Sequence, residues 1–238
     1  MTHKKQNLYL FLCTFFLTNA IVAEIIGVKL FSVEAVFGMP PAQLPTPFGA
    51  WDFNQTAGAI IWPFVFITSD IINEYFGRQG VRKISFITAG FIAYSFLIIY
   101  VATNLPPAKF WIEVNSDASG FNINEAFGKI FRQGLGIITG SISAFLIGQM
   151  LDAQIFHSLK KVTGNKKIWL RATGSTIVSQ LIDSFVVIYV AFYIFGNWTA
   201  AQCFSVALNG YLYKFVVAIL LTPLLYVAHY LIDRYLAD

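Results

Sequence analysis

Charged side chains lie within apolar segments of this sequence, where they are energetically costly. The segment SQLIDSFVVIYVAFYIF, residues 179–195, is apolar enough to lie in lipid, yet it contains Asp183 near its start. An ionised carboxylate at the centre of a bilayer costs on the order of 3 kcal/mol on insertion scales. Five further charged residues fall inside or at the edge of such segments: Glu24, Asp70, Glu74, Asp152 and Lys214. Because charges at this depth usually face a protein interior or an aqueous cavity, they predict a functional site.

Helical spacing groups these residues with other polar side chains. Steps of three and four residues place three sets on single helix faces: Thr176, Ser179, Gln180 and Asp183; Asp70, Asn73 and Glu74; and Gln149 with Asp152. A lipid-facing surface needs no polar face, so we expect these faces to point into a polar cavity. Two alternatives stay open. Residues near segment ends can lie in headgroup water, and Asp183 with Lys214 can form an ion pair that only joins helices.

The side chains expected in this cavity suit one kind of ligand. Carboxylates and amides accept and donate hydrogen bonds at the N–H edges of heterocycles, and aromatic faces stack on flat rings. The polar candidates are Asp70, Asp183, Asn19, Gln149 and Gln180, and the aromatic candidates are Trp62, Phe64, Phe66, Tyr211 and Tyr213. This set predicts a planar, polar, uncharged small molecule.

The composition requires a membrane. The chain has 57% hydrophobic and only 12% charged residues, and its mean hydropathy is +0.65. Soluble domains carry about 25% charged residues, so this chain could not maintain a soluble surface. No segment is long and polar enough to form a second domain, and residues 1–238 are expected to form one membrane domain.

The hydropathy pattern predicts an all-α integral membrane protein with six transmembrane helices. Each expected span is long enough to cross about 30 Å of hydrocarbon as a helix. The spans are residues 8–28, 56–76, 84–104, 133–154, 170–195 and 207–231. Segments rich in turn-forming or polar residues separate them: 39–47, 104–122, 162–167 and 195–199.

Basic residues predict the orientation. They concentrate before the first span, between spans two and three, between spans four and five, and after the last span: Lys4, Lys5, Arg78, Arg82, Lys83, Lys160, Lys161, Lys166, Lys167, Arg171 and Arg234. The positive-inside rule then places both termini in the cytoplasm, which agrees with an even number of spans. The alternative is a cleaved signal peptide ending near Ala23, which would leave five spans and reverse the C-terminus.

The sequence lacks the motifs that mark several classes of protein function. The sequence has no P-loop, no G-x-S-x-G, no H-E-x-x-H and no arginine ladder, so we expect no enzyme, no cofactor and no metal site. The net charge of +4 is explained by orientation and does not require a nucleic-acid partner. Cys13 and Cys203 have no motif spacing and are expected to be reduced packing residues. A stripe of small residues, Gly136, Gly140, Ala144 and Gly148, predicts close helix packing.

Five segments resemble those of the queuosine precursor transporter family, in the family's order. They are LTNAIVAEIIGVKLF with Asn19, WPFVFITSDIINEYFGRQGVRK, GQMLDAQIFHSLKK, WLRATGSTIVSQLIDSFVVIYVAFY and YLYKFVVAILLTPLLY. The resemblance implies a six-helix fold similar to the substrate-binding subunits of energy-coupling-factor vitamin transporters. It also implies import of 7-cyano-7-deazaguanine, 7-aminomethyl-7-deazaguanine or queuine across the inner (plasma) membrane.

A deazaguanine has the flat ring and the N–H edge inferred from the residues. We therefore expect Asp183 to accept its N–H groups, and Lys214 to offset the charge of Asp183. The other expected substrate-binding residues are Asn19, Gln149, Ser179 and Gln180. The expected gating or coupling residues are Asp70 and Glu74, paired with Arg78 or Arg82.

Two other functions stay open. The chain could be a substrate-binding subunit that needs a separate ATPase and scaffold, in which case the Gly136–Gly148 stripe would be exposed for docking. It could also be an assembly protein whose polar residues only join helices, and then it would bind no ligand. Beyond the small molecule and the lipid bilayer, assembly into a homo-oligomer stays open.

Overall fold

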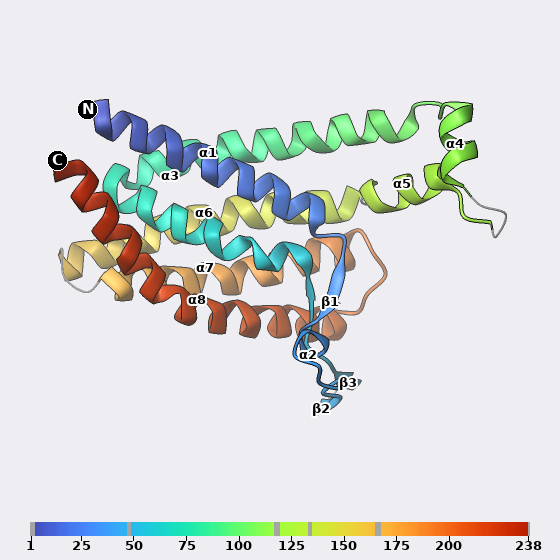
Figure 1. The fold of residues 1–238 in the computed structure, drawn as a ribbon. Helices are drawn as coiled ribbons and strands as arrows, with labels where there is room; N and C mark the ends of the chain where they lie inside the picture. The colour runs from blue at the N-terminus through green and yellow to red at the C-terminus, as the bar shows by residue number, and fades with distance from the viewer. Residues whose placement is uncertain (1–2, 47–48, 117–119, 133–134, 165–167, 238) are drawn as a thin grey trace.

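The computed structural model describes residues 3–46, 49–116, 120–132, 135–164 and 168–237, and it is mostly helical. The long helices are α1 (His3–Ile26), α3 (Trp62–Asn104), α6 (Leu135–Thr163), α7 (Ile168–Ile188) and α8 (Ala200–Ala237). Short helices are α2 (Val33–Val36), η1 (Ala57–Ile60), α4 (Lys109–Asn115), α5 (Ile123–Phe131) and the π-helix η2 (Tyr189–Ile194). The long helices lie alongside one another in a bundle (Figure 1).

The expected spans correspond to five long helices in the described residues, each apolar and long enough to cross a membrane. The expected spans 56–76 and 84–104 lie largely within α3, whose 43 residues are long enough, at 1.5 Å per residue, to cross the hydrocarbon about twice. Gly77 interrupts α3 with φ 71° and ψ 176°, a conformation that suits glycine. Figure 1 shows the consequence: α3 runs to the end of the bundle that holds the termini, turns, and runs back.

The expectation of an all-α chain needs a small correction. Four three-residue strands form two antiparallel pairs at the end of the bundle opposite the termini (Figure 1). β1 (Leu30–Ser32) pairs with β4 (Asn54–Thr56), and β2 (Leu44–Thr46) pairs with β3 (Gly49–Trp51). Pro40, Pro41 and Pro45 disfavour a helix between α2 and β3, and backbone groups in this part of the chain pair as short strands instead.

The segments expected to separate the spans have more structure than predicted. The polar segment 104–122 contains α4, and α5 precedes the fourth expected span. Asn122 caps α5 by accepting the N–H groups of Asn124 and Glu125. The segment 162–167 lies partly outside the described residues, whereas 195–199 is non-helical between η2 and α8 as expected.

The small-residue stripe of α6 packs inside the bundle, and the predicted close helix contact is confirmed. A Cβ atom added at Gly136 would lie 2.5 Å from the Cβ of Phe195, and one at Gly140 would lie 3.0 Å from the carbonyl oxygen of Val187. The stripe therefore holds α6 against α7 and η2, and it is not available for docking.

The ends of α1 and α8 lie together. The Lys4 ammonium lies 3.5 Å from the carbonyl oxygen of Tyr235, and its charge sits over the Tyr235 ring. Both termini therefore occupy one end of the bundle (Figure 1). Apolar side chains of α1, α3 and α6 fill the core between these helices. Phe16, Ile72, Phe145 and Phe156 are among the buried ones.

Candidate functional site

A seam of buried polar side chains joins α3, α6 and α7. The Ser69 hydroxyl donates to Gln149 Oε1 at 2.8 Å, and the Ser179 hydroxyl donates to Asp152 Oδ1 at 3.2 Å. The amide of Asn73 donates to the carbonyl oxygen of Ala153 at 3.2 Å. Asn73, Gln149, Asp152 and Ser179 come from the polar faces predicted from sequence, whereas Ser69 was not predicted, and the structure brings the three faces together in the interior.

A cavity lies beside this seam, between α3, α7 and α8. Its volume is about 580 Å³ when the space at its mouth is included. Trp62, Phe66 and Tyr213 contribute aromatic surface, and Asp70 and Gln180 contribute polar groups. Such a space, apolar with a few polar groups, is typical of a small-molecule site.

Two of the residues that line the cavity have unused hydrogen-bonding capacity. Among the described residues, Asp70 Oδ1 has no hydrogen-bond partner, and neither amide atom of Gln180 has one. Asp70 is 5% exposed and Gln180 is 2% exposed, so bulk water does not satisfy them. Buried polar groups are nearly always hydrogen-bonded, so these atoms indicate a place where a ligand completes the bonding.

The Asp183–Lys214 ion pair expected from the sequence is present. Lys214 Nζ lies 2.5 Å from Asp183 Oδ2, which joins α7 to α8. Lys214 lines the cavity, whereas Asp183 lies beside Gly148 of α6, where an added Cβ would come within 3.4 Å of the Asp183 Cβ. Glu24, whose carboxylate accepts the Ser141 hydroxyl, is close enough to interact with both charges. One carboxylate oxygen of Asp183 is therefore already paired with Lys214.

The other predicted substrate-binding residues have different positions. Gln149 and Ser179 lie in the polar seam, where Gln149 Nε2 has no partner among the described residues. Asn19 is half-buried and donates to the Phe15 carbonyl of its own helix at 2.8 Å, and it is not among the residues that line the cavity.

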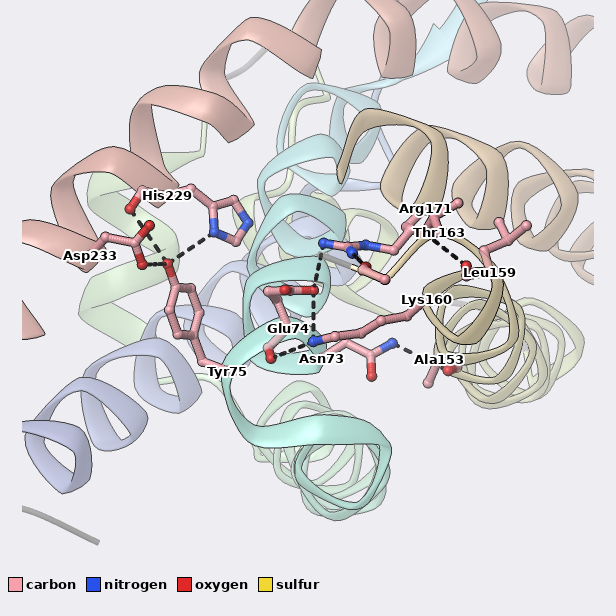
Figure 2. A network of polar contacts seen from close by, with 11 residues as sticks. Asn73, Glu74, Tyr75, Ala153, Leu159, Lys160, Thr163, Arg171, His229 and Asp233 are labelled. Atoms are coloured by element: carbon pink, nitrogen blue, oxygen red, sulfur yellow. Dashed lines mark hydrogen bonds and ion pairs between the residues drawn. The ribbon is translucent and has the colours of Figure 1, made fainter. Parts of the chain in front are cut away.

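The predicted pairing of Asp70 and Glu74 with Arg78 or Arg82 is wrong. Glu74 instead pairs with Lys160 and Arg171, both at 3.0 Å (Figure 2). Arg78 donates to Gln154 at 3.4 Å. The reason is the turn at Gly77, which separates Glu74 from the basic residues that follow it in sequence.

Sequence reasoning missed the buried role of Arg171, which it treated as an edge residue that sets orientation. Arg171 is 1% exposed, donates to the Gly164 carbonyl and lies over the Phe156 ring. A buried arginine needs a carboxylate, and Glu74 supplies it. Spacing along one helix could not reveal this, because the two residues are far apart in sequence.

Glu34 organises the part of the chain that holds α2 and the short strands, at the end of the bundle opposite the termini (Figure 1). Its carboxylate accepts the N–H of Phe53 at 2.7 Å, the N–H of Ala42 at 3.3 Å and the Ser32 hydroxyl at 2.8 Å. These hydrogen bonds, that from Phe53 above all, lower the pKa of Glu34 to about 2. The Asn209 amide donates to the carbonyl oxygen of Asp52 at 3.1 Å, which ties this segment to α8.

Within the described part of the chain, no three His, Cys, Asp or Glu side chains cluster as metal ligands.

Comparison with known proteins adds the last observations. Residues 56–228 match the family described as "Putative vitamin uptake transporter". The chain is 29% identical over 182 residues to the "Probable queuosine precursor transporter" of Bacillus subtilis, covering 76% of this chain and 74% of that protein. It is 27% identical over 174 residues to the "Queuosine precursor transporter" of Escherichia coli, covering 73% and 72%. No solved structure matches the chain significantly.

Proposed function

Because this chain belongs to the vitamin uptake transporter family, we propose that it imports a queuosine precursor into the cytoplasm. The precursor would be 7-cyano-7-deazaguanine, 7-aminomethyl-7-deazaguanine or queuine. Support comes from three relatives that are named as known or probable queuosine precursor transporters, and from a cavity whose chemistry suits a flat, polar ring.

The unpartnered groups of Asp70 and Gln180 carry this proposal. A deazaguanine has a ring N–H and an exocyclic amine beside a carbonyl oxygen. Asp70 Oδ1 accepts from the N–H groups, and the Gln180 amide accepts from one donor while donating to an acceptor. The ring stacks on the aromatic side chains of Trp62, Phe66 or Tyr213.

Asp183 takes a supporting role in this proposal. Its ion pair keeps Lys214 at the cavity wall, where the ammonium reaches the ring carbonyl of the ligand. Gln149 and Ser179 hold the seam behind the cavity and so position the α7 face that carries Gln180. Asn19 contacts the ligand only if α1 moves towards the cavity.

The membrane arrangement is part of the proposal. We place the chain in the inner membrane with six crossings, counting the two arms of α3 separately because α3 reverses at Gly77. The shared position of the termini and the basic residues near them support a cytoplasmic location for both ends (Figure 1). The fold of energy-coupling-factor substrate-binding subunits stays a prediction from the resemblance.

The alternative of a subunit that requires a separate ATPase loses one of its supports. It expected the Gly136–Gly148 stripe to be exposed for docking, but the stripe packs against α7 and η2. Uptake by the purified chain in liposomes without nucleotide separates the two functions, since a dependent subunit would give none.

The proposal is tested by uptake of radiolabelled 7-cyano-7-deazaguanine, 7-aminomethyl-7-deazaguanine and queuine into cells that cannot make queuosine. The wild-type chain is compared with Asp70→Asn and Gln180→Leu, and with Glu113→Gln on the exposed face of α4 as a control. We expect uptake by the wild type and the control, and its loss in the two cavity variants. Absence of uptake of all three precursors by a correctly inserted wild type would overturn the proposal.

A further inference from the structure

A second hollow lies at the end of the bundle that holds the termini. It is formed by α3, α7 and α8, the same helices that form the cavity of Asp70 and Gln180. Its volume is about 750 Å³ when the open space is included, and its wall consists of Glu74, Tyr75, Ile168, Arg171, His229 and Asp233. We call it the polar chamber. All but one of its six side chains are polar or charged, unlike the mainly apolar wall of the cavity.

Two buried groups in the chamber wall have capacity for a ligand. Among the described residues, His229 Nε2 and Arg171 Nε have no hydrogen-bond partner. Their residues are 9% and 1% exposed. The remaining contacts hold these side chains in place: His229 Nδ1 and the Tyr75 hydroxyl are 3.0 Å apart, and that hydroxyl donates to Asp233 Oδ1 at 2.6 Å.

Figure 2 shows how these groups are arranged. Tyr75 and Asp233 lie on one side of the His229 ring, so that its Nε2 is on the side away from Tyr75. The Glu74–Arg171 pair lies on the other side of the ring in this view, and both charges act on the imidazole. The unpartnered Nε2 of His229 therefore lies on the side of the ring that holds the Glu74–Arg171 pair.

The chamber and the cavity are consecutive along the same three helices. Asp70 lines the cavity and Glu74, four residues later in α3, lines the chamber. The same step separates Leu225 from His229 in α8, so the partition is one helical turn, about 6 Å. Pro223, two residues before Leu225 in α8, lacks a backbone donor, which weakens the helix near this partition.

We propose that the polar chamber is a second binding station, which the ligand occupies after it leaves Asp70 and Gln180 on its way to the termini side. This inference rests on the proposed import function. The ligand class is the same neutral heterocycle. Its N–H group matches the unpartnered His229 Nε2, which is an acceptor because the Tyr75 hydroxyl donates to Asp233, and its carbonyl matches the unpartnered Nε–H of Arg171. A ligand held only at the first site would have to lose all its polar contacts at once, and the chamber replaces them in stages.

The test separates binding from transport. Ile168→Trp fills the chamber without changing a charge, and Val178→Trp, on a surface of α7 where Val178 is 44% exposed, is the matched control. Affinity for 7-cyano-7-deazaguanine is measured on the purified chain in nanodiscs, and uptake of the same compound is measured in liposomes. We expect Ile168→Trp to keep wild-type affinity and to lower the uptake rate about tenfold or more, with Val178→Trp unchanged in both assays.

A second variant guards against a folding defect in the first. His229→Leu keeps a side chain of moderate size and removes the unpartnered nitrogen, and we expect the same separation of affinity from uptake. Wild-type uptake in both variants would overturn the inference, as would a parallel loss of affinity and uptake in both. Failure of the proposed function looks different, because then the wild type itself neither binds nor imports the compound.

Discussion

Two carboxylates one turn apart on α3 have opposite surroundings. Asp70 is buried beside the cavity, and its Oδ1 has no partner among the described residues. Glu74 meets two cations, Lys160 and Arg171, each at 3.0 Å. A buried carboxylate without a partner is costly, whereas one that pairs with a buried arginine compensates a charge that would otherwise be unpaired. The difference indicates that Glu74 joins helices, and it supports the proposal that Asp70 binds the ligand.

The largest expected effect is the loss of stability in Glu74→Gln. Without the carboxylate, the guanidinium of Arg171 stays buried with no opposite charge. Breaking a buried ion pair at one partner costs about 3–5 kcal/mol, and Lys160, which is partly exposed, adds little. Equilibrium unfolding of the purified chain in detergent micelles measures the change.

Two variants sharpen this result. Glu113→Gln on the exposed face of α4 removes a carboxylate of the same kind and should leave the unfolding free energy unchanged. Glu74→Gln combined with Arg171→Gln removes both buried charges and should recover most of the loss. Equal stability of Glu74→Gln and wild type would mean that the ion pairs do not hold α3, α6 and α7 together.

Unlike Glu74→Gln, which should lower stability, Asp70→Asn should lower the affinity for the ligand. Hydrogen bonds to a charged acceptor contribute about 1.5–3 kcal/mol, so affinity for 7-cyano-7-deazaguanine should fall about 10- to 100-fold. Stability should change little, since no partner of Asp70 Oδ1 is lost. Calorimetric titration and unfolding of the same sample measure both quantities. A stability loss with unchanged affinity would reverse the roles assigned to the two carboxylates.

Disturbing the contact of α6 with α7 and η2 should lower the unfolding free energy by a smaller amount, which depends on how closely the substituted glycine is packed. α6 supplies Asp152 to the polar seam and Lys160 to Glu74, so displacing it disturbs both regions. Gly136→Ala places a Cβ 2.5 Å from that of Phe195, and we expect a loss of about 1–3 kcal/mol in unfolding free energy. Gly148→Ala meets the Asp183 Cβ only at 3.4 Å and serves as the control. Equal stability of the two variants would contradict close packing at Gly136.

The sequence predicted the polar faces, but of their partners on other helices it predicted correctly only the Asp183–Lys214 pair. Steps of three and four residues identify which side chains share a helix face, which is why Asp70, Gln149 and Gln180 were expected in the interior. Partners come from other helices, and spacing along one helix carries no information about them. The sequence therefore paired Glu74 with Arg78 or Arg82, whereas the turn at Gly77 leaves it facing Lys160 and Arg171.

The sequence was also limited in choosing which carboxylate contacts the ligand. Asp183 was expected to contact the ligand because it lies within an apolar segment, and this contact stays a prediction. The structure pairs Asp183 with Lys214, and position in an apolar segment does not distinguish such a carboxylate from one that faces a cavity. Among the elements, the long helices follow from hydropathy. The strands and α4 are short and are formed by local hydrogen bonds, so hydropathy averaged over about 20 residues does not resolve them.

The smallest effect we expect lies outside the spans, at Glu34, which contrasts with Asp70 because N–H groups satisfy its carboxylate. The pKa of Glu34 is lowered to about 2, against about 4.3 for an unperturbed glutamate. A lowered folded-state pKa adds stability above the unfolded value and loses it as the pH falls towards the folded value. Hydrogen exchange at the Phe53 and Ala42 amides should therefore accelerate, relative to the intrinsic rate, as the pH falls from about 5 to 2. In Glu34→Gln the protection should be lower at neutral pH and should not depend on this titration. Equal pH dependence in both chains would show that another group controls the segment.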